Sequence, residues 1–257
     1  MHFLLTNDDG IYATGLSSLK KELSKEAECL IVAPEREQSA VGHAITLSRP
    51  LMVRKFRKNG KFFGYAVAGT PADCVKIGIK ELTDKPIDLV VSGINLGPNV
   101  GIDVIYSGTV SAATEAAILG VSSLAISLDT RSDDADFSFA AKFARKLVLF
   151  MLRHSSLLKG TPLNVNIPAV PKDQIKGVAV TRQGSAQMME TFERRVDPRE
   201  NIYYWLVAES LTNTEGMTDS DTTALKNGMI TITPLHYDLT HYDVMADLHE
   251  TMKELTF

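Results

Sequence analysis

Short apolar runs with almost no polar interruption recur along this chain, and they restrict its fold more than any other feature. Such runs are typical of strands that are buried on both faces of a parallel sheet. They alternate with longer segments of helical period, as strands do in βαβ units. The strand candidates are residues 3–5, 30–33, 89–91, 124–126 and 163–167.

Two of the intervening segments carry their apolar residues on one helix face. Leu16, Leu19 and Leu23 recur at helical spacing after the first run. The apolar residues at 137, 140, 144, 147 and 151 form a second such face before the last run. The pattern predicts a doubly wound α/β fold with a mostly parallel, Rossmann-like sheet.

Two regions depart from this alternation. Residues 51–67 alternate as a hairpin does, with Asn59-Gly60 at the turn. Residues 183–228 mix charged with aromatic side chains and end in a polar stretch, so we expect a β-hairpin arm that projects from the core. We therefore expect one domain over 1–257, made of an α/β core of about 1–182 and 229–240, that arm, and a C-terminal helix of about 241–256.

The overall charge argues against a polyanionic partner. The 257 residues carry a net charge of −4 with a pI near 5.9, so no basic field exists to hold duplex nucleic acid. The two cysteines give no disulfide framework. We find no signal-peptide pattern and no segment as long as a membrane span. We expect a cytoplasmic protein without nucleic-acid or membrane partners.

Adjacent carboxylates follow the first strand directly. Asp8 and Asp9 stand in the segment Thr6-Asn7-Asp8-Asp9-Gly10, at the carboxyl end of a strand, where open α/β sheets bind their ligands. Two adjacent acids repel each other unless they share a cation. The alternative is a polar turn into a helix, for which this sequence is well suited.

Two further polar loops open on the same edge of the predicted sheet. Ser39, after the second strand, offers a hydroxyl ligand, although an ordinary loop serine is the alternative. Residues 92–110 carry four glycines and lead from a strand into an alanine-rich helix. Glycines let a ligand approach the backbone, and a helix start suits phosphate, so Ser107, Gly108 and Thr109 are the candidate anion site. The alternative is a connector with small residues for helix packing.

Together the three loops supply two carboxylates, a hydroxyl, an amide and a helix N-terminus. Oxygen ligands of this kind select Mg²⁺, Mn²⁺ or Ca²⁺ over zinc. A bound cation would neutralise charge on a phosphoryl group and orient a water for attack. Asp8 is the candidate for positioning that water, with Asp238 as a second choice.

The order of these motifs resembles that of the SurE stationary-phase survival proteins over nearly the whole chain. The segments that carry the resemblance are Leu5-Thr6-Asn7-Asp8-Asp9-Gly10-Ile11, Ala33-Pro34-Glu35-Arg36 leading to Ser39, Gly69-Thr70-Pro71-Ala72-Asp73-Cys74-Val75, Ser92 to Asn99 and Tyr106 to Val110, with Asp197-Pro198-Arg199, Tyr203-Tyr204-Trp205 and Thr233-Pro234-Leu235.

The resemblance implies a metal-dependent 5′-nucleotidase that hydrolyses nucleoside monophosphates, and it allows short polyphosphate as a substrate. It implies one divalent cation per subunit, Mg²⁺ or Mn²⁺, which Ca²⁺ can replace in crystals. It also implies a homodimer or homotetramer that exchanges arms and C-terminal segments. By the same resemblance the metal ligands are Asp8, Asp9, Ser39 and Asn95, the first two also being catalytic, and the phosphate is held by Asn99, Ser107, Gly108 and Thr109.

One position departs from the family pattern. Some members carry a histidine four residues after the aspartate aligned with Asp238, where this chain has Tyr242 and places His241 one residue earlier. We therefore expect a surface position for His241. Two other functions stay open. One is a phosphatase that works through a phospho-aspartate, which the spacing of Asn7 and Asp9 disfavours. The other is a non-catalytic nucleotide-binding regulatory protein with a structural cation.

Overall fold

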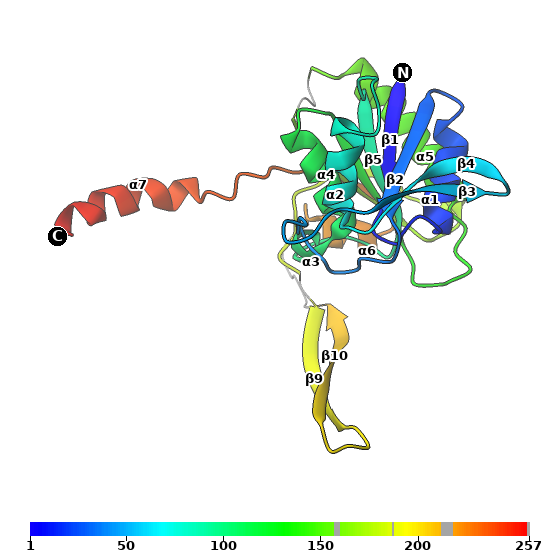
Figure 1. Cartoon of the computed structure of the whole chain (residues 1–257). Helices are drawn as coiled ribbons and strands as arrows, with labels where there is room; N and C mark the ends of the chain where they lie inside the picture. The colour runs from blue at the N-terminus through cyan, green and yellow to red at the C-terminus, as the bar shows by residue number, and fades with distance from the viewer. Residues whose placement is uncertain (157–159, 187, 212–217, 256–257) are drawn as a thin grey trace.

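A nine-stranded sheet forms the centre of the molecule in this computed structural model, which describes residues 1–156, 160–186, 188–211 and 218–255 (Figure 1). The strand order is β3-β4-β2-β1-β5-β6-β7-β11-β8. The six neighbouring strands from β4 to β7 run parallel, and β3 and β11 pair antiparallel to β4 and β7. The strands are β1 His2–Thr6, β2 Glu28–Pro34, β3 Val53–Lys58, β4 Lys61–Val67, β5 Leu89–Leu96, β6 Ser123–Asp129, β7 Leu163–Pro168, β8 Val178–Val180 and β11 Ile230–Pro234.

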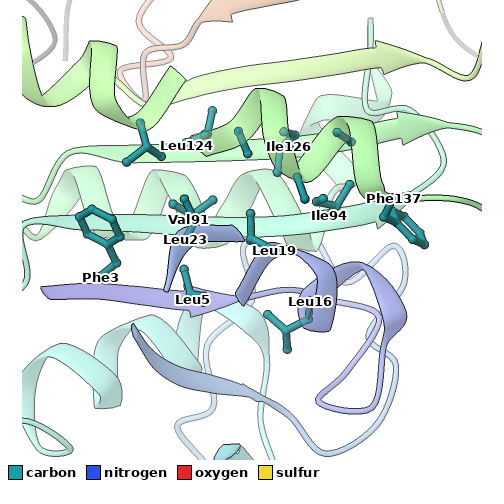
Figure 2. Packing of buried hydrophobic residues seen from close by; sticks show 14 of the residues in the cluster. Phe3, Leu5, Leu16, Leu19, Leu23, Val91, Ile94, Leu124, Ile126 and Phe137 are labelled. Carbon is teal, nitrogen blue, oxygen red and sulfur yellow. The ribbon is translucent and has the colours of Figure 1, made fainter. Parts of the chain in front are cut away.

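Helices cover both faces of this sheet, which confirms the predicted α/β fold. Alternate residues of β1 point to opposite faces: Phe3 and Leu5 belong to the larger apolar cluster, and Leu4 belongs to a second one. The larger cluster includes α1 (Thr14–Leu23) and α5 (Ser138–Arg153), and Figure 2 shows part of it. The second cluster includes α2 (Pro71–Lys80) and α4 (Gly108–Ile118).

The leucines of α1 show how the apolar spacing fixes the packing. Leu16, Leu19 and Leu23 are fully buried, and Figure 2 shows them directed toward β1 and β5. Replacing one such leucine by alanine costs about 2–5 kcal/mol, because both transfer energy and packing are lost. The helix is therefore held to the sheet by the residues that made it recognisable in the sequence.

The helix α2 begins at a capping box that apolar periodicity does not reveal. The side chain of Thr70 accepts a hydrogen bond from the backbone of Asp73 at 3.1 Å, and the Asp73 carboxylate accepts one from the backbone of Thr70 at 2.9 Å. Pro71 occupies the first helical position, where its missing N–H is not needed. Two shorter helices, α3 (Asp103–Tyr106) and α6 (Asp221–Lys226), complete the core with the 3₁₀ turn Lys172–Gln174.

Two elements project from the core in Figure 1. The strands β9 (Met188–Val196) and β10 (Ile202–Leu211) pair antiparallel as a hairpin arm, and α7 (Tyr242–Thr251) forms a separate C-terminal helix that ends in the 3₁₀ turn Met252–Glu254. The hairpin is shorter than the expected arm of 183–228, since α6 packs against β11 and β7. Residues 187 and 212–217 of that range, and residue 256 of the expected helix, lie outside the described residues.

Across the ranges that the structure describes, no helix has the length and apolarity that a bilayer crossing requires.

The order of the strands creates one place where ligands are expected. The chain leaves β1 for β2 on one side of it, whereas β5 pairs with β1 on the other side. The strand order thus reverses at β1, and open α/β sheets bind ligands at the carboxyl ends of the strands beside such a switch point. Asp8 and Asp9 follow β1 directly, and Asn95 lies at the end of β5.

Candidate metal and phosphate site

A cavity of about 770 Å³ lies at this switch point, a size typical of small-molecule sites. Its lining comes from the ends of β1 and β5, the loop after β2, the start of α4, the loop after β6 and the arm. The structure therefore brings together three polar loops that are distant in sequence. Six of the residues singled out from the sequence line this cavity, namely Asp8, Asp9, Ser39, Asn95, Asn99 and Ser107.

Asp8 is attached to the first turn of α4. One carboxylate oxygen accepts a hydrogen bond from the Thr109 backbone at 3.1 Å, and the other accepts one from the Thr109 hydroxyl. A Cβ atom on Gly108 would lie 2.8 Å from the Cβ of Asp8, so only glycine permits this approach. A carboxylate at a helix N-terminus is favoured by the helix dipole.

Burial raises the pKa values of both aspartates, and negative charge nearby adds to the increase. Burial raises the pKa of Asp8, and its hydrogen bonds with Thr109 offset part of that increase. Burial, followed by the charge of Asp8, raises the pKa of Asp9 to about 7, while the Leu96 backbone amide acts in the opposite direction. A cation shared between the two carboxylates would favour their ionised forms.

The Ser39 hydroxyl donates a hydrogen bond of 2.5 Å to Glu37. Both residues are exposed and line the cavity. The negative charge of Glu37 contributes to the raised pKa values of Asp8 and Asp9. Sequence reasoning missed Glu37, and its place two residues before Ser39 in the same loop was the available signal.

The two asparagines of the third loop have different environments. Asn95 uses its amide nitrogen to donate to the Gly97 carbonyl at 2.8 Å, which leaves its Oδ1 as the atom suited to a cation. Asn99 is buried, and its Nδ2 donates to Ser127 on β6 at 2.8 Å. Its carbonyl accepts from Asn164 and Asn166 on β7 at 2.8 and 3.0 Å. Asn99 is therefore anchored to the sheet as well as facing the cavity.

Ser107 is the N-terminal cap of α4. Its hydroxyl oxygen accepts a hydrogen bond from the Val110 backbone at 3.1 Å, and a serine hydroxyl in that position still has its own proton to donate. Thr109 is fully buried, and both of its donors described above go to Asp8. The start of α4 thus binds Asp8 through Thr109 and lines the cavity through Ser107.

Asp238 and His241 do not line the cavity in this chain. Asp238 is half-buried. His241 is exposed and accepts a hydrogen bond from Val244 at the start of α7, which agrees with the surface position expected for it. Asp238 accepts hydrogen bonds from Thr240 and from the hydroxyl of Tyr242, and these bonds lower its pKa to about 2.

Several exposed side chains at the cavity were not recognised in the sequence. Tyr106 of α3 and Leu206 of β10 are 56% and 52% exposed, and Arg131 and Asp133 come from the loop after β6. Arg131 is the one cationic side chain among the described residues that line the cavity. No motif marks these positions, because they meet only when the loops and the arm are folded.

The donor set fits a hard cation. Within the part of the chain that the structure describes, no three histidine, cysteine, aspartate or glutamate side chains cluster in a way that could hold a metal ion. The candidate ligands are instead two carboxylates, a hydroxyl and an amide oxygen, which suit Mg²⁺, Mn²⁺ or Ca²⁺. A cation beside the two aspartates would lower their raised pKa values, because it stabilises the ionised carboxylates.

The chain is similar to known proteins of one family. Residues 3–190 match the family described as Survival protein SurE. A protein called 5′-nucleotidase SurE from Syntrophus aciditrophicus (strain SB) is 62% identical over 256 residues, which cover 100% of this chain and 96% of that protein. Another of that name, from Syntrophobacter fumaroxidans (strain DSM 10017 / MPOB), is 50% identical over 248 residues, covering 96% of this chain and 98% of that protein.

The fold agrees with the sequence relationship. The crystal structure of the SurE protein from Aquifex aeolicus superposes with a TM-score of 0.81 at 40% identity, covering 98% of this chain and 99% of that chain. The similarity therefore extends over the core, the arm and the C-terminal segment together. The chain belongs to the SurE family.

Proposed function

We propose that this chain is a divalent-metal-dependent 5′-nucleotidase that hydrolyses nucleoside monophosphates to nucleoside and phosphate, with short polyphosphate as a further substrate. The observation that carries the proposal is the pair Asp8 and Asp9, adjacent carboxylates with raised pKa values at the switch point of the sheet. The family membership and the name 5′-nucleotidase of the similar proteins support phosphoric monoester hydrolysis.

One divalent cation per subunit, Mg²⁺ or Mn²⁺, would be held by Asp8, Asp9, Ser39 and Asn95. Ca²⁺ suits the same oxygen donors. When bound, it would supply positive charge to the phosphoryl group and a fixed site for the attacking water. Asp8 and Asp9 are the catalytic residues in this scheme. Asp8 is held in place by Thr109, which suits it to orient a water toward the phosphorus atom.

The start of α4 is the proposed phosphate subsite, formed by Asn99, Ser107, Gly108 and Thr109. The helix N-terminus favours an anion through its dipole. Ser107 adds a hydroxyl. Asn99 adds a side-chain amide that bonds to Ser127 of β6, while its backbone is bonded to β7. Thr109 belongs to this helix start. Its hydroxyl and backbone N–H donate to the Asp8 carboxylate, so it also positions Asp8.

The arm and the C-terminal segment are proposed to join subunits into a homodimer or homotetramer. Phe192, Tyr204 and Trp205 of the arm are 70%, 57% and 57% exposed in the single chain. A lone hairpin is marginally stable in water, and exposed rings of this size favour an apolar surface to cover them. Exchange of arms between subunits would provide such a surface.

A phosphate-release assay tests the proposed activity. The protein is treated with EDTA, transferred to metal-free buffer, and given AMP, GMP or tripolyphosphate with Mg²⁺, Mn²⁺, Ca²⁺ or Zn²⁺. We expect no hydrolysis in EDTA and recovery with Mg²⁺ or Mn²⁺. Full activity in excess EDTA would contradict the metal site. A trapped phosphorylated aspartate would favour the phospho-aspartate mechanism, and nucleotide binding without any phosphate release would favour the regulatory alternative.

A further inference from the structure

The loop that carries Ser39 is fixed by its contacts and not by secondary structure of its own. Residues 35–52, here called the Ser39 loop, connect β2 to β3, and all of them are described as neither helix nor strand. On the side before Ser39, the backbone N–H of Gln38 donates to the carbonyl of Asp8 at 2.8 Å. Ala40 and Gly42 after Ser39 have positive φ angles of 53° and 59°, so the chain turns sharply there.

The side after Ser39 is held by three helices. The Gly42 N–H donates to the Tyr106 carbonyl of α3 at 2.9 Å. Thr46 donates to the Asp73 carboxylate of α2 through its backbone at 3.0 Å and its hydroxyl at 2.6 Å. Between these contacts, His43 Nε2 donates to Glu115 Oε2 of α4 at 2.9 Å. The His43 bond is the contact of these that joins the loop to α4.

Glu115 is a buried carboxylate with two partners, the imidazole of His43 and the ammonium of Lys76. Its side chain is 5% exposed, and its other oxygen lies 2.8 Å from the ammonium of Lys76 on α2. Removing one partner from a buried carboxylate leaves charge without compensation. His43 and Lys76 therefore both stabilise Glu115, but only His43 belongs to the Ser39 loop.

The same helix also holds Asp8. Thr109 in the first turn of α4 binds the Asp8 carboxylate, and Glu115 lies six residues further along that helix, about 9 Å away at 1.5 Å per residue. An α-helix is rigid over this length. Figure 1 shows α4 beside α2 at the same side of the sheet. Asp8, after β1, and the Ser39 loop, after β2, are thus both bonded to the same rigid helix, α4.

We propose that His43 and Glu115 are positioning residues for the metal site, which set Ser39 relative to Asp8 by tying the Ser39 loop to α4. The inference rests on the proposed function, in which Ser39 and Asp8 are ligands of the same cation. Without the His43 bond, the loop keeps the Gln38 bond to Asp8 before Ser39 and its contacts to α2 and α3 after Ser39. The side after Ser39 loses its connection to α4, the helix whose first turn binds the Asp8 side chain. The position of Ser39 relative to Asp8 is then less restrained, and the affinity for the cation falls.

Direct titration with Mn²⁺ tests this role without relying on turnover. The dissociation constant is measured by calorimetry or from the electron paramagnetic resonance signal of free Mn²⁺, for wild-type protein and for His43→Ala, His43→Gln, Lys76→Ala and Ser39→Ala. We expect His43→Ala to weaken Mn²⁺ binding about tenfold, as loss of a residue that orients a ligand does. His43→Gln keeps a donor near the Nε2 position and should recover most of that loss.

Lys76→Ala is the matched control, because it removes the other partner of Glu115 without touching the loop. It should lower the melting temperature as His43→Ala does while leaving the Mn²⁺ dissociation constant within about twofold of wild type. In the Ser39→Ala background, His43→Ala should have no further effect on Mn²⁺ binding, since it acts through Ser39.

Three results would overturn the assignment: Mn²⁺ affinity unchanged in His43→Ala, equal losses in His43→Ala and Lys76→Ala, or effects of His43→Ala and Ser39→Ala that add. The first two would show that the His43 bond is a stability contact only. A wild-type protein that hydrolyses nucleotides yet binds no Mn²⁺ or Mg²⁺ would instead contradict the proposed metal site, and the role of His43 with it.

Discussion

The switch-point edge and the two projecting elements contrast in what they bury. Near the edge, charged groups are withdrawn from water: Asp8 is buried, and so is Glu115 of α4, which is held by two partners. In the arm and in α7, apolar side chains such as Trp205 and Leu248 face solvent instead. The edge has the features of a site for a small cation, whereas the arm and α7 have the features of a surface for another protein chain. The contrast separates the residues proposed for chemistry from those proposed for assembly.

The largest effect is expected from removing one charge of the aspartate pair. Asp8→Asn and Asp9→Asn should each lower turnover of AMP by roughly a hundredfold or more, because each loses a ligand of the cation that neutralises the phosphoryl charge. Asp134→Asn, in the exposed loop after β6 and outside the cavity lining, is the matched control and should retain wild-type turnover. A variant at Asp8 or Asp9 with near-normal activity at low metal concentration would exclude that residue as a ligand.

Substitutions in the arm test the proposed assembly of subunits. Replacing Tyr204 and Trp205 by serine should shift the protein toward smaller species in sedimentation, because it removes apolar area that an exchanged arm would bury. The melting temperature should also become lower and more dependent on concentration. Arg199→Ser, at the tip of the hairpin, should change neither. Wild-type protein that sediments as a 28.1 kDa monomer at micromolar concentration would refute the exchange.

Thr109 distinguishes a phosphate contact from a contact that holds Asp8. Thr109→Val removes a hydroxyl that donates to a buried carboxylate, a bond of the charge-assisted kind worth about 1.5–3 kcal/mol. We expect metal affinity and turnover both to fall, by about tenfold or more, while Thr109→Ser keeps the hydroxyl and most of the activity. A rise in KM for AMP with unchanged Mn²⁺ affinity would assign Thr109 to the phosphate alone.

The smallest effect is expected in the stability of metal-free protein. The folded-state pKa of Asp9 is about 7, against 3.8 as its ordinary value, so the folded state binds the proton more tightly than the unfolded chain does. Ionising Asp9 therefore destabilises the fold as pH rises from 4 to 7, and the loss is complete above pH 7. With partial solvent access, we expect on the order of 1–2 kcal/mol.

Asp9→Asn has no carboxylate to ionise at this position, so comparing it with wild type measures the stability that ionisation of Asp9 removes. In EDTA the variant should melt a few degrees above wild type at pH 8, and the difference should disappear near pH 4. Addition of Mn²⁺ at pH 8 should reverse the order, because wild type alone keeps the full ligand set. Equal melting temperatures at both pH values would show that Asp9 is not held in the environment described here.

The parts of the fold that follow from local pattern could be predicted from the sequence. The buried strands and α1 were recognisable because their apolar residues recur at the same intervals as the positions that face the core. The hairpin arm was recognisable from a segment that mixes charged with aromatic side chains. The helix α2 was not among the predicted helices, although the Thr70 to Asp73 capping box marks its start. The helix α6 was placed within the arm, because nothing local shows that Asp221 is buried and accepts hydrogen bonds from Gly101 and Gly184.

The site residues that directly follow strands could be predicted from the sequence. Asp8, Asp9, Ser39 and Asn95 were selected by their order after strands and by the family resemblance, and the structure places all four at one cavity. The bond from Thr109 to Asp8 depends on how α4 packs, and no spacing rule contains that information. The same holds for Arg131 and for the His43 contact, which join segments far apart in the chain. The cytoplasmic location stays a prediction from the sequence.

The most direct test of the account is to locate the cation. Crystals soaked in Mn²⁺, measured on both sides of the manganese absorption edge, should show one anomalous peak per subunit. We expect that peak within about 2.6 Å of carboxylate oxygens of Asp8 and Asp9, the Ser39 hydroxyl and the Asn95 amide oxygen. A peak at another place in protein whose AMP hydrolysis requires Mn²⁺, or no peak at all, would contradict the claim that the switch-point aspartates form the metal site.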